Sequence, residues 1–231
     1  MNLLMFDIDG TLIHSHEDEV ACFELAINTV LGISGIDKNL HSYPHVSDSG
    51  ILKECIHRAL NRYPSAEEIE AVESAYLAHF KERLSQNPIQ PIDGAASLIE
   101  ILQSRQDVAL AVATGSHQRA AKLKLSNVAP SLCDAPMGTS TDSHIRTIIM
   151  ETALNAAKRV YQLEQFDRII YIGDGLWDIE AVKQLQWGFI GIASQHSRHT
   201  LQSFGAKCVI ENYLTPSDFL AFVHSDELLI I

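Results

Sequence analysis

Two aspartates, Asp7 and Asp9, directly follow a short apolar stretch at residues 3–6. Such a stretch ending at a turn signal is typical of a buried strand in a parallel sheet. Side chains two apart on an extended segment project to the same side, so one carboxylate can attack an electrophile while the other passes a proton to the leaving group. The alternative is that Asp and Gly serve here only as turn residues between a strand and a loop.

A second polar segment consists of Thr114, Gly115 and Ser116. It lies between the almost unbroken apolar run 108–113, which predicts a strand, and a helix predicted over residues 117–125. A hydroxyl beside free backbone N–H groups at a helix N-terminus can bind phosphate. The alternative is an ordinary helix cap, in which a hydroxyl satisfies the first N–H groups of the helix.

A third polar segment contains Asp174 and Asp178, after a strand predicted over residues 168–172. Two acids four apart at the start of a helix face the same way. Together with Asp7 they can supply the oxygen ligands that Mg²⁺ prefers. The alternative is that Asp174 caps the helix while Asp178 interacts favourably with the helix dipole.

Strands and helices alternate over the second part of the chain, which predicts an α/β fold with a doubly wound parallel sheet. Parallel strands end at the same edge of a sheet, so the three polar segments can converge on one crevice. The predicted strands are residues 3–6, 108–113, 132–137 (the weakest), 168–172, 188–193 and 207–210. The predicted helices are residues 95–104, 117–125, 143–161, 176–185, 197–204 and 215–223.

Residues 15–90 form a largely helical insertion directly after the first strand, so the chain divides into a core of residues 1–14 and 91–231 and a small helical domain. Inserted there, the domain can sit above the carboxylates as a lid that excludes water and selects substrate. Its helices are predicted over residues 20–31, 48–61 and 65–85. Ser47 to Gly50 is expected to cap the second of these helices, with a substrate contact as the alternative.

The motif DxDGT at residues 7–11, the strand-TG at 114–115 and GDxxxD at 173–178 resemble, in this order, the haloacid dehalogenase superfamily across essentially the whole chain. The insertion resembles the alpha-helical cap of that family. This resemblance implies a Rossmannoid, HAD-like core of the phosphatase-like branch (phosphoglycolate phosphatase-like). It further implies a phosphoric monoester hydrolase that uses Mg²⁺ and an aspartyl-phosphate intermediate on a small phosphorylated metabolite.

By this resemblance, Asp7 is expected to be the nucleophile and Asp9 the general acid and base. Dehalogenating members lack the second acid, because halide leaves carbon without a proton donor, so the presence of Asp9 favours phosphate esters. Two alternatives stay open. One is a phosphomutase of the same superfamily, and the other is a non-catalytic binding or regulatory module that keeps the fold.

The resemblance also implies sites for phosphate and for a metal ion. Thr114 and the Gly115 N–H are expected to bind phosphate oxygens. The expected Mg²⁺ ligands are the Asp7 carboxylate, the Asp9 backbone carbonyl and Asp174, with Asp178 assisting indirectly. The metal offsets the repulsion between these acids and the phosphate.

One position departs from the family pattern. The family places a lysine at or near the start of the helix before the GD strand, where it bridges nucleophile and phosphate. Here that helix carries Arg146 in its first turn and Lys158 about four turns in. We prefer Arg146, which is nearer the strand end and can bind phosphate through its two-pronged guanidinium, and keep Lys158 as the alternative.

The formal net charge is −12, which argues against nucleic acid and anionic membranes as partners. The four cysteines are scattered without a CxxC pair, as expected for a reduced, cytoplasmic protein. No segment has the pattern of a signal peptide or approaches the length of a membrane span. These features are ordinary for a soluble globular protein, whereas the enzymatic activity and the small-molecule partner are what the resemblance implies. None of these features predicts an oligomeric state.

Overall fold

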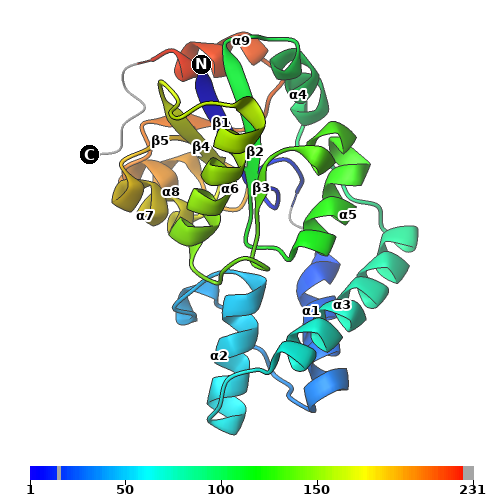
Figure 1. Cartoon of the computed structure of the whole chain (residues 1–231). Coiled ribbons are helices and arrows are strands. Elements are labelled where there is room, and N and C mark those ends of the chain that lie inside the picture. Colours follow the sequence, from blue (N-terminus) through cyan, green and yellow to red (C-terminus); the bar gives the residue numbers. More distant parts are fainter. Residues whose placement is uncertain (15–16, 226–231) are drawn as a thin grey trace.

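The computed structural model describes residues 1–14 and 17–225, which contain a six-stranded parallel sheet in the order β3-β2-β1-β4-β5-β6 (Figure 1). The strand that precedes the acidic loop is therefore central, with β2 on one side and β4 on the other. The strands are β1 (Asn2–Phe6), β2 (Val108–Ala113), β3 (Met137–Gly138), β4 (Ile169–Gly173), β5 (Gly188–Ile192) and β6 (Cys208–Ile210).

The register of the sheet aligns the ends of its three central strands. Phe6, the last residue of β1, pairs with Val112 of β2 and with Ile172 of β4. The next residue, Asp7, still donates its N–H to Ile172 O at 2.9 Å. The polar segments that follow these strands therefore begin at the same level and on the same edge of the sheet.

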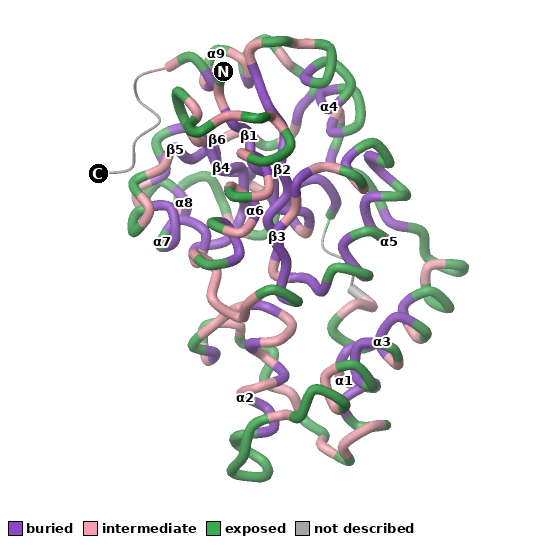
Figure 2. Tube along the Cα trace, in the orientation of Figure 1, coloured by how far each residue is buried: buried purple, intermediate pink, exposed green. Residues whose placement is uncertain are grey.

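Helices cover both faces of the sheet, and the alternation of side chains along β1 shows how. Leu4 and Phe6 belong to the cluster formed with α4, α5 and α9, while Leu3 and Met5 belong to the cluster formed with α6, α7 and α8. Figure 2 shows the strands as the buried centre. These helices are α4 (Ala95–Gln103), α5 (Gln118–Val128), α6 (Arg146–Tyr161), α7 (Leu176–Leu185), α8 (Arg198–Ser203) and α9 (Pro216–Val223). The predicted doubly wound α/β fold is confirmed.

Residues 17–86, here called the helical insert, contain three further helices beyond the carboxyl ends of the strands (Figure 1). These are α1 (Glu17–Leu31), α2 (Asp48–Leu60) and α3 (Ala66–Gln86). Phe23, Ile56, Tyr76 and Phe80 form a hydrophobic cluster of their own, which Ala120 of α5 joins from the core. The insert thus has its own small core and packs against α5. None of the described helices combines the length and the apolar character needed to cross a bilayer.

The strand predicted over residues 132–137 is wrong in its position. A short 3-10 helix occupies Pro130–Asp134, and the strand is reduced to Met137–Gly138. Proline favours the first position of a helical turn and lacks the N–H that a sheet needs, so the two prolines around this segment confine the strand to its end. The helix predicted from residue 143 begins at Arg146, because residues 139–142 form a turn in which Asp142 accepts hydrogen bonds from Thr139.

Candidate active site

The acidic loop after β1 is held by backbone hydrogen bonds. The N–H groups of Thr11, Leu12 and Ile13 all point to the carbonyl of Ile8, at 3.1, 2.8 and 3.1 Å. The Ile8 N–H donates in turn to Asp7 Oδ1 at 2.7 Å. The Asp7 carboxylate therefore has a fixed position at the end of the central strand.

Gly10 allows this loop to meet the loop that carries Asp174. Its φ of +71° lies in the left-handed region, and a Cβ atom built on it would stand 2.0 Å from Asp174 Oδ2. A side chain at this position would both strain the backbone and displace the Asp174 carboxylate. Glycine is thus required for the two acidic loops to approach each other.

Three buried carboxylates meet where these loops converge. Oxygen atoms of Asp7, Asp174 and Asp178 lie within 4.8 Å of one another. Burial raises the pKa of Asp7 to about 7, although the Arg146 guanidinium opposes the shift. Burial, followed by the charges of Asp178 and Asp7, raises the pKa of Asp174 well above its usual value. A cluster of hard oxygen donors that repel one another fits a divalent cation such as Mg²⁺.

Arg146 lies against this cluster at the start of α6. Its Nη1 is 3.6 Å from Asp7 Oδ2, and its Nε is 3.4 Å from Asp178 Oδ1. Burial alone would lower the pKa of Arg146, but the neighbouring carboxylates, Asp178 above all, hold it above its usual value. Lys158 lies in the last turn of the same helix, away from the carboxylates. Of the two candidate cations, the structure brings only Arg146 to Asp7.

The segment after β2 lies beside the acidic loop. Thr114 is buried, its N–H donates to Gly138 O at 3.1 Å, and its hydroxyl accepts from Ser116 N–H at 3.2 Å. A Cβ atom on Gly115 would stand 2.9 Å from Arg146 Nη2, so the guanidinium reaches over this loop. The expected phosphate-binding residues and Arg146 therefore lie together. Ser116, which belongs to the segment predicted either to bind phosphate or to cap the helix, donates to Asp9 Oδ2 at 3.0 Å.

The sequence did not reveal two residues near Asp9. Lys124 contacts Asp9 directly, and Glu19 contacts Lys124. Lys124 of α5 donates to Asp9 Oδ2 at 2.7 Å and also to Glu19 of the helical insert. Burial, reinforced by the charge of Asp9, raises the pKa of Glu19 to about 7. One signal could have revealed Lys124: it occupies the apolar face of its helix, with Ala120 four residues before it and Val128 four residues after.

The helical insert docks on the polar loops through the start of α2. Ser47 Oγ donates to His144 O and Ser49 Oγ to Ser140 O, both at 3.0 Å. Asp48 N–H donates to the carbonyl of Gly115 at 2.8 Å. Ser47 also accepts from Gly50 N–H, which confirms the predicted helix cap.

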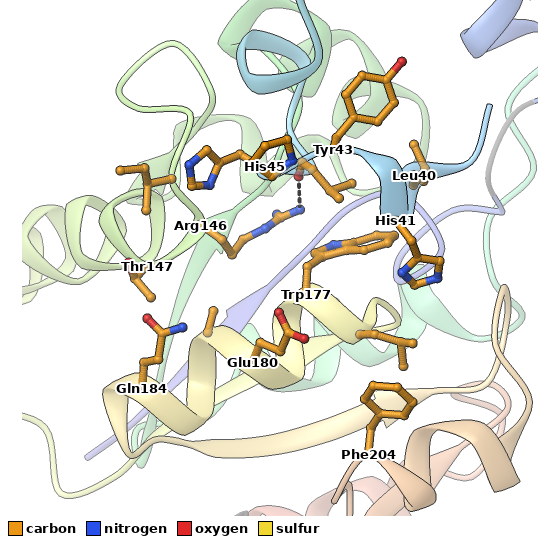
Figure 3. Close-up of a pocket in the computed structure, with 15 residues that line it drawn as sticks. Leu40, His41, Tyr43, His45, Arg146, Thr147, Trp177, Glu180, Gln184 and Phe204 are labelled. Atoms are coloured by element: carbon orange, nitrogen blue, oxygen red, sulfur yellow. Dashed lines mark hydrogen bonds between the residues drawn. The ribbon is translucent and has the colours of Figure 1, made fainter. Parts of the chain in front are cut away.

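Two cavities lie between the insert and the core, and Arg146 and Trp177 line both of them. The smaller, of about 160 Å³, is lined by Asp7, Asp9 and Thr114 from the core and by residues of the insert including Glu19. The larger, of about 350 Å³, lies between the segment 40–46 and helices α6 and α7 (Figure 3). Only the smaller cavity contains the candidate nucleophile.

Comparisons with known proteins identify the family of the chain. The family model described as haloacid dehalogenase-like hydrolase matches residues 1–186, and the chain belongs to this family of hydrolases. No curated protein matches the sequence.

Solved structures are similar over nearly the whole chain. A hydrolase from Pseudomonas syringae is 21% identical, with a TM-score of 0.74 over 97% of this chain and 100% of that one. A predicted phosphatase from Clostridium acetobutylicum is 23% identical (TM-score 0.64, 95% and 98%). A predicted phosphoglycolate phosphatase from Haemophilus somnus 129pt is 16% identical (TM-score 0.65, 96% and 97%). At these identities the likeness concerns the fold.

We predict that Mg²⁺ stabilises the protein through the buried carboxylates. At tenfold above its Kd, the ion should add about 1.4 kcal/mol to the free energy of unfolding, or about 3–6 °C in Tm. Asp174→Asn should abolish this shift, and in chelator it should be at least as stable as wild type because one repelling charge is gone. Thermal unfolding with Mg²⁺ and with chelator measures both, with the exposed Asp134→Asn as control. A full Mg²⁺ shift in Asp174→Asn would contradict the assignment.

Gly10→Ala should separate backbone strain from damage to the site. The left-handed φ alone costs about 1–3 kcal/mol of stability. Gly35 has a similar φ of +78° but open space around it, so Gly35→Ala is a matched control. We expect both variants to lose stability in thermal unfolding and only Gly10→Ala to lose the Mg²⁺-dependent rise in Tm. Equal Mg²⁺ responses would show that the approach of Gly10 to Asp174 does not matter.

Proposed function

We propose that the protein is a Mg²⁺-dependent phosphatase that hydrolyses a phosphate monoester of a small metabolite through an aspartyl phosphate on Asp7. The observation that carries this proposal is the position of the Asp7 carboxylate. It lies beside the Arg146 guanidinium and within 4.8 Å of carboxylate oxygens of Asp174 and Asp178, in a cavity that Asp9 also lines. A nucleophile, an acid-base group, a cation and a metal site are thus available to one substrate.

In the first step, an oxygen of the Asp7 carboxylate attacks phosphorus and the ester P–O bond breaks. The electron pair leaves with the alcohol oxygen, which receives a proton from the Asp9 carboxyl group. Arg146 and the Gly115 N–H hold the phosphoryl oxygens as charge redistributes over them. The products of this step are the alcohol and Asp7 aspartyl phosphate.

In the second step, the Asp9 carboxylate takes a proton from water while the water oxygen attacks phosphorus. The bond between phosphorus and Asp7 breaks, which returns the Asp7 carboxylate and releases inorganic phosphate. The same group thus acts first as acid and then as base.

Asp7 and Asp174, with the Asp9 backbone carbonyl, are the groups that we expect to hold Mg²⁺, and Asp178, which lies within 4.8 Å of both carboxylates, would assist indirectly. When bound, the ion supplies positive charge beside the phosphoryl group and the carboxylates. The raised pKa values of Asp7 and Asp174 support this role, because a cation would favour their ionised forms.

We assign the cap function to residues 15–90 and the catalytic core to residues 1–14 and 91–231. Docking of α2 supports this division, because the start of the helix contacts Gly115 of the expected phosphate-binding segment and the carbonyl of His144. The cavity of about 160 Å³ that remains around Asp7 and Asp9 favours a small leaving group. Exclusion of bulk water would strengthen the electrostatic interactions inside.

The nucleophile assignment predicts the outcome of Asp7→Asn. Release of phosphate from 4-nitrophenyl phosphate with Mg²⁺ should fall below about a thousandth of the wild-type rate, because an amide cannot form the acyl phosphate. The exposed Asp134→Asn should keep its activity. Activity of Asp7→Asn equal to wild type would refute the mechanism. Transfer of phosphate to a second hydroxyl, instead of its release, would identify a phosphomutase.

The cation assignment predicts different effects at the two ends of α6. Arg146→Met should lower kcat/KM at least about tenfold, since a hydrogen bond to a charged group contributes about 1.5–3 kcal/mol. Lys158→Met should stay within about twofold of wild type because that side chain lies away from the carboxylates. The reverse pattern in steady-state kinetics would transfer the phosphate-binding role to Lys158.

A further inference from the structure

Lys124 occupies a position that lysine seldom takes. It lies two turns into α5 on the face shared with Ala120 and Leu125, and its side chain is 0% exposed. Among residues 1–14 and 17–225 it is the one lysine that is buried. Removing an ammonium group from water is costly unless charges and hydrogen bonds replace the lost hydration. The partners of Lys124 therefore indicate what the residue is for.

All three N–H donors of the ammonium have acceptors on three different parts of the protein. Lys124 Nζ donates to Asp9 Oδ2 at 2.7 Å, to Ser116 Oγ at 2.9 Å and to Glu19 Oε1. An ammonium has three donors and no acceptor, so this set uses its full capacity. Lys124 is thus committed to neighbouring side chains and has no donor left for a phosphate oxygen.

These contacts fix one oxygen of Asp9 and leave the other available. Asp9 Oδ2 accepts from both Lys124 and Ser116, which prevents the carboxylate from rotating freely. Asp9 Oδ1 is also buried but accepts no hydrogen bond from any described residue. Asp9 lines the cavity that contains Asp7. Oδ1 is therefore the Asp9 oxygen without a hydrogen-bond partner among the described residues, and the one left to a substrate oxygen or a water that enters beside it.

Glu19 extends the same network into the helical insert. It belongs to α1, and its Oε1 also accepts from Tyr76 OH of α3 at 3.0 Å. A second ion pair joins the outer side of α5 to the insert, where Arg119 Nε lies 3.0 Å from Glu73 Oε1. Helix α5 is thus tied to the insert at two points, and the inner one leads directly to Asp9.

We propose that Lys124 is a positioning residue, which holds Asp9 Oδ2 so that Oδ1 faces the leaving group, and that Glu19 makes this geometry depend on docking of the helical insert. The inference rests on the proposed function, because it concerns the proton that Asp9 transfers there. The ammonium at Oδ2 fixes the direction in which Oδ1 points, so without Lys124 the Asp9 carboxyl group can rotate away from the leaving group. Loss of Lys124 therefore slows proton donation more than it slows attack on phosphorus.

Aryl phosphates of graded leaving-group acidity test this inference. A dinitrophenolate leaves without a proton, whereas an unsubstituted phenolate depends on one. The measured quantity is kcat/KM with Mg²⁺ for 2,4-dinitrophenyl, 4-nitrophenyl and phenyl phosphate, because it reports phosphoryl transfer to Asp7 before water attacks.

For Lys124→Met we expect the dinitrophenyl ester to stay within about threefold of wild type and the phenyl ester to fall at least about tenfold. Lys124→Arg, which keeps the charge, should recover part of the phenyl phosphate activity. The exposed Lys122→Met on the same helix should match wild type for all three esters. An equal loss for all three esters in Lys124→Met would reduce Lys124 to a structural residue and overturn the inference.

Glu19→Gln tests the link to the insert without removing the buried ammonium. The inference therefore remains testable even if Lys124→Met fails to fold. We expect it to lower kcat/KM for phenyl phosphate more than for the dinitrophenyl ester, in the same direction as Lys124→Met. The exposed Glu82→Gln of the insert is the matched control. Unchanged discrimination among the esters in Glu19→Gln would overturn the role of the insert.

The same measurements separate this inference from the proposed function. A wild-type protein that releases no phosphate from any of the esters, or an Asp7→Asn variant that releases it as fast, would refute the proposed function and this inference with it. A wild-type activity that depends on Asp7, combined with unchanged discrimination in Lys124→Met, would overturn only the role of Lys124.

Discussion

The repulsion among three buried carboxylates is the constraint around which the rest of the structure is arranged. Asp7, Asp174 and Asp178 lie at one edge of the sheet with oxygen atoms within 4.8 Å of one another. Their burial would be unfavourable without positive charge nearby, which Arg146 provides in part. The parallel register brings the loops together, and Gly10 removes the side chain that would keep them apart. Fold and electrostatics thus concentrate mutually repelling acidic groups at one edge of the sheet, which is where we propose that a cation and an anionic substrate bind.

Much of this arrangement is predictable from the sequence because the determining signals are local. Apolar runs that end at Asp7, Thr114 and Asp174 predict strand ends, and a parallel sheet places those ends together. The same argument favours Arg146 over Lys158, because Arg146 is nearer to the end of a strand. The position of a residue along a helix can be read from the sequence. The sequence therefore also indicates which of the two cations can reach the crevice.

The parts that the sequence did not predict depend on contacts between distant segments. Lys124 and Glu19 are separated by 105 positions, and neither stands in a motif. Their pairing requires the insert to fold back onto α5, which no local pattern specifies. The prediction of the third strand was wrong for a different reason: a 3-10 helix occupies Pro130–Asp134, and the strand is confined to Met137–Gly138, where Gly138 packs so closely on α6 that a Cβ atom would stand 2.0 Å from Ile149 O. Tertiary packing overrode the weak apolar signal there.

The docking of the helical insert also bears on how such a protein can diversify. Two contacts near the start of α2 use backbone atoms of the insert: Asp48 N–H donates to Gly115 O, and Val46 O accepts from Arg146 Nη2 at 3.0 Å. Main-chain groups are present whatever side chain a position carries. Amino-acid changes in the insert can therefore reshape the cavity lining while the seating of the insert on the catalytic loops persists. The residues that set substrate selectivity can therefore change in evolution partly independently of the residues proposed to carry out the chemistry.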